Sequence, residues 1–272
     1  VQKRNQALTA LSFPHPEFRS GQRVLAESVY KAVSTGRCLM AQAPTGIGKT
    51  IGTVFPMLKA APCQKLDKVF FLTAKTPGRK LALDALSVIG RSAPQLTLRV
   101  LELVARDKAC EYPTNACNGD ACPLAKGFYD RLPAARSEAL ISPWLDQSGL
   151  RDVALRHQVC PYYLSQELAR WADVVIADYN YYFDLSALLF GLCQFNQWRV
   201  AVLVDEAHNM IERTRQMYSA SLDQHAMNLV RQVAPEPLKK SLQRVNREWN
   251  TLHKDQVAPY QAYSGVPEKF LA

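Results

Sequence analysis

Several features that would assign the protein to a simple class are missing from the sequence. It contains no apolar run of the roughly 18 residues that a membrane-spanning helix requires. Residues 1–5 (VQKRN) do not begin the apolar core of a secretion signal, and because the initiator Met is also absent we expect the chain to start inside a longer protein. No internal repeat or low-complexity tract is present, which excludes repeat architectures.

A disulfide framework is also absent. The seven cysteines are odd in number and four of them gather in one stretch, which argues against a secreted, disulfide-bonded protein. We therefore expect a reducing cytoplasm and a metal or cluster site. Acidic residues are in deficit, with 24 Asp and Glu against 33 Lys and Arg, and the net charge of +9 favours a polyanionic partner such as nucleic acid.

The most informative stretch is Ala43-Pro-Thr-Gly-Ile-Gly-Lys-Thr50, which has the pattern of a phosphate-binding loop with alanine in place of the first glycine. We expect a strand over the apolar run 38–41 before it and a helix over 51–60 after it. Such a turn directs backbone N–H groups and a helix N-terminus at phosphates. Lys49 can reach the outer phosphates, and the Thr50 hydroxyl can complete the coordination of a magnesium ion.

A second motif, Asp205-Glu-Ala-His208, follows the apolar run 200–204. Two acids at the end of a buried strand suit magnesium chemistry. The first carboxylate can hold the ion through its water shell, and the second can orient a water at a γ-phosphate.

Apolar runs at 68–72, 96–103 and 171–178 predict further strands, and they alternate with helices predicted at 22–34 and 79–88. Ser20 is a candidate N-cap for the first of these helices. The alternation predicts an α/β fold with a parallel sheet. Between 104 and 170 the apolar periodicity weakens and four cysteines appear, so we interpret this stretch as an insertion, and we expect mostly polar helices beyond residue 210.

Two local patterns leave alternatives open. Gln22 stands where a carboxamide can read adenine, but it also fits a solvated glutamine at a helix start. Thr73, Lys75 and Thr76 follow a predicted strand and can hold a phosphate backbone, but they also fit a plain strand-to-helix turn with Thr76 as the cap.

Taken together, the two motifs resemble those of superfamily 2 helicases, and the cysteine-bearing insertion narrows the resemblance to the iron–sulfur group that includes XPD and DinG. The motifs lie about 155 residues apart with the cysteines between them, and both Cys160-Pro-Tyr-Tyr163 and Ala172–Tyr181 resemble segments of that group. The resemblance covers roughly residues 12–225. It implies a RecA-like motor domain in two parts (1–103 and 171–222), an inserted iron–sulfur domain (104–170) and the start of a helical arch (223–272).

The resemblance also implies a role for each matched residue. Gln22 would contact adenine, and the triphosphate would be held by Thr45, Gly46, Gly48, Lys49 and Thr50. Asp205, with Thr50, would bind magnesium, Glu206 would activate water, and His208 would couple the nucleotide state to DNA binding. Thr73, Lys75 and Thr76 match a DNA-backbone motif in which lysine replaces the family's arginine and loses its bidentate fork.

The same resemblance makes Cys110, Cys117, Cys122 and Cys160 the ligands of a [4Fe–4S] cluster. Their gaps of six, four and thirty-seven residues are not those of a zinc ribbon, although thiolates also bind zinc and the four can also be free thiols. The first gaps differ from those expected in XPD itself, which favours a bacterial, cytoplasmic relative. The other cysteines (Cys38, Cys63 and Cys193) lie in or beside apolar segments and are predicted to be core residues.

The implied activity is that of an ATP-dependent 5′→3′ DNA helicase acting on single-stranded or forked DNA, with ATP and Mg²⁺ at the motor site. A second motor domain would complete the site elsewhere in the full-length chain, so this part alone should bind nucleotide weakly and hydrolyse it slowly. The alternatives are a DNA-dependent or nuclease-linked ATPase that does not unwind, and a zinc-and-nucleic-acid binding module.

Overall fold

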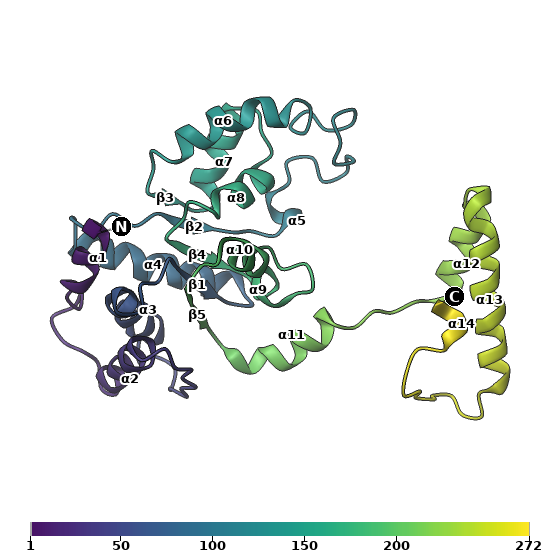
Figure 1. The fold of residues 1–272 in the computed structure, drawn as a ribbon, viewed down its shortest axis with the longest axis horizontal. Coiled ribbons are helices and arrows are strands. Elements are labelled where there is room, and N and C mark those ends of the chain that lie inside the picture. Colours follow the sequence, from purple (N-terminus) through teal and green to yellow (C-terminus); the bar gives the residue numbers. More distant parts are fainter. Residues whose placement is uncertain (1, 272) are drawn as a thin grey trace. The chain divides into compact units, whose positions relative to one another are not determined.

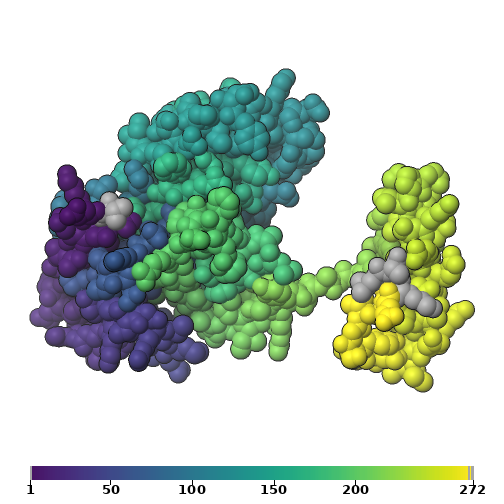
Figure 2. Space-filling model, in the orientation of Figure 1, coloured from purple at the N-terminus to yellow at the C-terminus, as the bar shows by residue number. Residues whose placement is uncertain are grey.

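The computed structural model describes residues 2–271, and the chain forms two compact units, Val1–Tyr218 and Ser219–Ala272 (Figures 1 and 2). This boundary lies close to the predicted one between residues 222 and 223. Within residues 2–271, no helix combines the length and the apolar character that crossing a bilayer requires.

The first unit is built on a five-stranded sheet in the order β3-β2-β4-β1-β5, and every strand pair is parallel (Figure 1). The strands are β1 (Lys68–Leu72), β2 (Val100–Glu102), β3 (Trp144–Leu145), β4 (Val174–Ala177) and β5 (Val200–Val204). The predicted α/β class is confirmed. Because all strands run the same way, their carboxyl ends share one edge of the sheet, where ligands of open α/β sheets bind.

Alternate side chains of each strand enter two different cores. Val69 and Phe71 of β1 pack into one, and Phe70 and Leu72 pack into the other. The first core is covered by α1 (Gln2–Thr9), α2 (Gln22–Ser34), α3 (Lys49–Ala60) and α4 (Thr76–Ser92). The second is covered by α6 (Phe128–Ala139), α7 (Gln147–Arg156), α8 (Pro161–Leu168) and α10 (Leu188–Asn196). Both faces are therefore buried, as the near-continuous apolar strands require.

The predicted insertion shares the core of the main sheet. Trp144 and Leu145, inside the range 104–170, form β3 and extend the main sheet beside β2. Leu150 of α7 and Leu164 of α8 pack in the same cluster as Phe70 of β1. The polar composition of residues 104–127 hid this packing in the sequence, because the core residues of the insertion lie after residue 127.

The strand predicted over 38–41 is wrong. These residues adopt no strand, and Met40 is 96% exposed. β5 ends the sheet on that side within the described residues, and residues 38–41 form no ladder with its free edge. An apolar run adopts a strand only where a neighbour supplies hydrogen bonds.

Helix ends differ in detail from the sequence expectations. Helix α2 spans the predicted residues, but Gly21, with φ of 76°, occupies the N-cap position without a side-chain bond, so the Ser20 cap is wrong. The helices predicted after residue 210 are confirmed. They are α11 (Met210–Met217) and, in the second unit, α12 (Gln224–Val233), α13 (Glu236–Asp255) and α14 (Glu268–Leu271).

Candidate nucleotide site and cysteine cluster

The phosphate-binding loop takes its shape from two glycines with positive φ, Gly46 at 86° and Gly48 at 80°. Helix α3 begins directly after the second of them, so the first N–H groups of the helix face the loop. A Cβ on Gly48 would lie 2.3 Å from Nε2 of Gln22. Glycine is therefore required at position 48 for two reasons, the positive φ of the backbone and the close approach of the Gln22 side chain.

Gln22 is buried, at 2% exposure, and its carboxamide is turned towards this loop. The backbone N–H of Arg19 donates to Oε1 at 3.0 Å, and Nε2 donates to the Gly48 carbonyl at 3.0 Å. The solvated alternative for this residue is therefore wrong. Its contact with adenine stays a prediction, and in this structure it braces the loop.

Lys49 brings the two distant motifs together. Its Nζ lies 3.3 Å from Oε1 of Glu206 and 3.5 Å from the Ala43 carbonyl. Nδ1 of His208 lies 3.4 Å from the other oxygen of Glu206, on a side chain that is 73% exposed. A cation from the loop and a carboxylate from the acidic motif thus face the same space. Thr45 lies exposed in the loop and Thr50 in the first turn of α3.

Asp205 is held by the end of the neighbouring strand. Its N–H donates to the Leu72 carbonyl at 2.9 Å, and its Oδ2 accepts from Oγ1 of Thr73 at 3.4 Å. Burial, together with the negative charge of Glu206, raises the pKa of the Asp205 carboxyl. A Cβ on Gly78 would lie 2.2 Å from Oγ1 of Thr73, so this glycine lets α4 approach the acid.

The three residues predicted to contact DNA do not share one surface. Thr73 is 2% exposed and faces Asp205, whereas Lys75 and Thr76 are exposed. The alternative with Thr76 as a helix cap is wrong, because Lys75 is the N-cap of α4 and Thr76 is its first residue. A DNA-backbone contact is compatible with the exposure of Lys75 and Thr76 and stays a prediction.

Buried polar groups join this region to the insertion. Nε of Arg79 lies 2.9 Å from Oε1 of Glu102, and both side chains are under 10% exposed. The other oxygen of Glu102 accepts from the N–H of Gln147 at the start of α7, at 3.0 Å. Nη2 of Arg79 donates to Oγ1 of Thr76 at 3.3 Å. One ion pair therefore connects the start of α4, strand β2 and helix α7.

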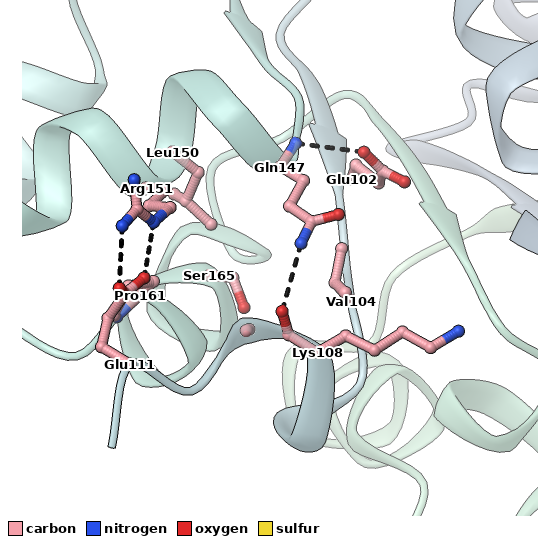
Figure 3. Close-up of a pocket in the computed structure, with 10 residues that line it drawn as sticks. Glu102, Val104, Lys108, Glu111, Gln147, Leu150, Arg151, Pro161 and Ser165 are labelled. Carbon is pink, nitrogen blue, oxygen red and sulfur yellow. Dashed lines mark hydrogen bonds and ion pairs between the residues drawn. The ribbon is translucent and has the colours of Figure 1, made fainter. Parts of the chain in front are cut away.

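A cavity of about 140 Å³ lies beside this pair, between β2 and the helices of the insertion (Figure 3). Its charged and polar groups are bonded to each other across it. Arg151 forms two bonds of 2.6 and 2.8 Å with the carboxylate of Glu111, and Nε2 of Gln147 donates to the Lys108 carbonyl at 3.2 Å (Figure 3). These contacts tie α7 to the segment on either side of Cys110.

The structure places the four predicted cluster cysteines in or beside the loops of the insertion. Cys110 directly follows α5 (Arg106–Ala109), and Cys160 directly precedes α8. Burial raises the pKa of the Cys160 thiol, and charge on Cys110 and Cys122 adds smaller contributions to the rise. Burial and charge on Cys117 and Cys160 likewise raise the pKa of Tyr163.

The donor set suits an iron–sulfur cluster or zinc. Among the described residues, however, no three His, Cys, Asp or Glu side chains stand in metal-ligating positions. Of the other cysteines, Cys193 is buried as predicted. The core prediction is wrong for Cys38 and Cys63, which are exposed because the strand expected around the first does not form and the second lies in a surface turn, Ala61–Gln64.

Sequence reasoning missed Tyr179, which lies two residues beyond β4 and is completely buried. Its hydroxyl donates to the Asp205 carbonyl and lies 3.1 Å from the Glu206 carbonyl. Nη2 of Arg213 bonds the residues on either side of it, Asp178 at 2.7 Å and Asn180 at 2.8 Å. A tyrosine at the end of an apolar strand was the available signal, but the sequence does not show where its hydroxyl points.

Two family models match this chain. The DEAD_2 model matches residues 87–227, and the DEAD/DEAH box helicase model matches residues 23–119. Together they span both motifs and the cysteines.

Curated proteins with similar sequences are helicases. The chain is 31% identical over 146 residues to a regulator of telomere elongation helicase 1 homolog of Anopheles gambiae, and 27% identical over 161 residues to the human protein of that name. It is 29% identical over 107 residues to the general transcription and DNA repair factor IIH helicase subunit XPD of Dictyostelium discoideum. These matches cover 48%, 53% and 38% of this chain but only 13–14% of each relative.

Solved structures agree on the fold. A structure titled XPD_Helicase superposes with a TM-score of 0.61, covering 93% of this chain and 44% of the other. One titled Truncated XPD superposes with a TM-score of 0.56, covering 91% and 71%. Sequence identity is 18% in both cases, so these likenesses concern the fold, which is the RecA-like arrangement of a parallel sheet between helices.

Proposed function

This chain belongs to the DEAD_2 family of helicase domains, and we propose that it supplies the nucleotide-binding half of an ATP-dependent DNA helicase. The observation that carries the proposal is the meeting of the two motifs, with Nζ of Lys49 3.3 Å from the carboxylate of Glu206. The match covers only 13–14% of the three curated relatives described above, so the activity is proposed for the full-length protein.

We propose the following division of labour at the site. The N–H groups at the start of α3 and the Lys49 ammonium bind the β- and γ-phosphates of ATP, and Glu206 orients the attacking water. Asp205 and Thr50 present a carboxylate and a hydroxyl, oxygen donors that suit Mg²⁺. When bound, that ion neutralises charge on the phosphate oxygens. Lys49 moves from Glu206 to phosphate as ATP enters, because both partners compete for one ammonium.

For the insertion we propose a [4Fe–4S] cluster held by Cys110, Cys117, Cys122 and Cys160. The support is the set of four thiol donors in the insertion and the family resemblance, and zinc is the alternative. Such a cluster would fix the loops between α5 and α8. We also propose that single-stranded DNA contacts Lys75 and Thr76, and that the motor moves 5′→3′.

The decisive experiment uses the full-length protein, measuring ATP hydrolysis with and without single-stranded DNA and unwinding of duplexes with 5′ or 3′ tails. We expect DNA-stimulated hydrolysis and unwinding of the 5′-tailed duplex. Lys49→Ala should lower kcat by about 10²–10³-fold, because a charge that stabilises the transition state is lost. Lys65→Ala, an exposed lysine before β1, is the matched control and should hydrolyse ATP normally.

Three results would contradict the proposal. An absence of hydrolysis in the wild-type protein would refute nucleotide turnover. Hydrolysis without unwinding of either duplex would instead support a DNA-dependent ATPase. Unwinding of only the 3′-tailed duplex would reverse the polarity.

A further inference from the structure

Tyr179 is a buried side chain whose hydroxyl is directed at the acidic loop, residues 205–209 after β5. Its ring lies in the core that contains Leu72 and Ala177, and none of the residue is exposed to solvent. A buried phenol needs a hydrogen-bond acceptor. It finds one at the Asp205 carbonyl, with the Glu206 carbonyl 3.1 Å away. A core residue just beyond β4 thus reaches across β1 to the loop that follows β5.

The loop needs such support because its backbone is unusual. Glu206 has φ of 51° and ψ of 47°, the left-handed conformation that is unfavourable for a residue with a side chain. Such conformations persist where the surroundings over-determine them, and they gather at functional sites. Asn209, which belongs to the loop itself, donates twice to the Glu206 carbonyl. Its backbone N–H lies at 2.9 Å and its Nδ2 at 3.0 Å. Tyr179 instead ties the carbonyls of Asp205 and Glu206 to the core of the sheet.

Asp205 is consequently fixed from three directions. Leu72 of β1 accepts from its N–H, Thr73 donates to its carboxylate, and Tyr179 donates to its carbonyl. Arg213 of α11 holds the same segment through its bonds to Asp178 and Asn180, the residues that flank Tyr179.

We propose that Tyr179 is a positioning residue for ATP hydrolysis, which holds the left-handed turn so that the carboxylates of Asp205 and Glu206 are presented at the phosphate-binding loop. The proposal rests on the proposed function, since it assigns a role within that ATP site. Tyr179 itself touches neither nucleotide nor metal. Loss of its hydroxyl would let the acids shift, and a misplacement of about 1 Å can cost about 100-fold in rate.

The test compares Tyr179→Phe with Tyr181→Phe in the full-length protein. Tyr181 donates to the Val104 carbonyl at 2.9 Å, so its variant loses an equivalent tyrosine–carbonyl bond from the same segment but away from the acids. The readouts are kcat and KM for ATP in DNA-stimulated hydrolysis, the Mg²⁺ concentration for half-maximal rate, and Tm. Rates are normalised to the folded fraction.

We expect Tyr179→Phe to lower kcat by about 10- to 100-fold and to raise the Mg²⁺ requirement, with KM for ATP changed less than about threefold. Tyr181→Phe should keep kcat within about twofold of wild type. A merely structural role for Tyr179 would lower Tm without changing kcat or the Mg²⁺ midpoint.

The proposal is overturned if both variants turn over like wild type, or if both lose kcat equally. If Tyr179→Phe does not fold, Arg213→Gln replaces it, because it loosens the same segment from a partly exposed position. That variant should lower kcat about threefold or more, and an unchanged kcat would then refute the proposal. A wild-type protein without any ATP hydrolysis would refute the proposed function instead.

Discussion

The nucleotide end of the sheet and the cysteine-bearing insertion are held together by different means. At the nucleotide end, Asp205 is bonded through its N–H, its carbonyl and its carboxylate to two neighbouring segments, the end of β1 and the residues after β4. In the insertion, Cys117 is exposed, and the residues between α5 and α6 adopt only turns and bends. The first site is organised by strand register, and we infer that the second depends on a bound group to order its loop.

The largest effect is expected at the nucleotide end. Asp205→Asn should lower kcat of the full-length protein by about 10³-fold, because the proposed magnesium carboxylate is lost. The same variant should raise Tm without Mg²⁺ by a few degrees, about 1–4 °C, since a half-buried charge beside Glu206 disappears.

The pH dependence of Tm tests the expected stabilisation by Asp205→Asn. A carboxyl whose pKa is raised by folding destabilises the folded state above that pKa and ceases to do so below its unfolded value. Wild type should therefore gain stability relative to Asp205→Asn on acidification. If the Tm difference between the two proteins is the same at pH 7 and pH 5, the ionised Asp205 carboxyl does not destabilise the folded protein.

The next largest effect is expected for the buried ion pair of Arg79 and Glu102, which connects the two regions. Arg79→Met leaves the Glu102 carboxylate buried without its cation, and we expect a loss of about 3–5 kcal/mol in the free energy of unfolding. The double variant Arg79→Met/Glu102→Leu should recover part of the loss. The exposed pair of Arg23 and Glu27 is the control, and Arg23→Met should cost less than about 1 kcal/mol in urea titrations.

The insertion can be separated from the nucleotide site by removing one predicted ligand. Cys117→Ser should abolish bound iron and sulfide and make residues 110–127 sensitive to protease, while ATP affinity changes less than about threefold. Cys63→Ser, an exposed cysteine in another turn, should retain the metal. Stoichiometric zinc in the wild-type protein would exclude the iron–sulfur assignment.

A smaller effect is expected where the insertion returns to the sheet. Nζ of Lys68 donates to the carbonyls of Arg170 and Ala172, and burial lowers its pKa from 10.5 to about 8. Between these values the unfolded chain binds the extra proton, so stability should rise with pH, by at most about 1.4 kcal/mol per pH unit. Lys68→Met should remove that rise from the urea-unfolding profile measured between pH 8 and 10.5.

The sequence alone was informative wherever the local pattern determined the outcome. Helix α2 begins and ends where its apolar spacing predicted, and β1, β4 and β5 lie within the predicted apolar runs. Both motifs lie at this end of the sheet, where Nζ of Lys49 is 3.3 Å from Glu206. Prediction was wrong where the outcome depended on a neighbour. The run at 38–41 lacks a pairing strand, and Trp144 and Leu145 join the sheet although their surroundings are polar.

The sequence by itself determined that a phosphate-binding loop and an acidic pair flank a stretch with four cysteines, because those residue types and spacings carry their own chemistry. Only the tertiary structure decided which groups hold that chemistry in place. It turned Gln22 into the core against Gly48, buried Thr73 beside Asp205, and carried the Tyr179 hydroxyl across β1 to the acidic loop. These contacts join residues 26 to 132 positions apart, and strand order and register, not local sequence, set such distances.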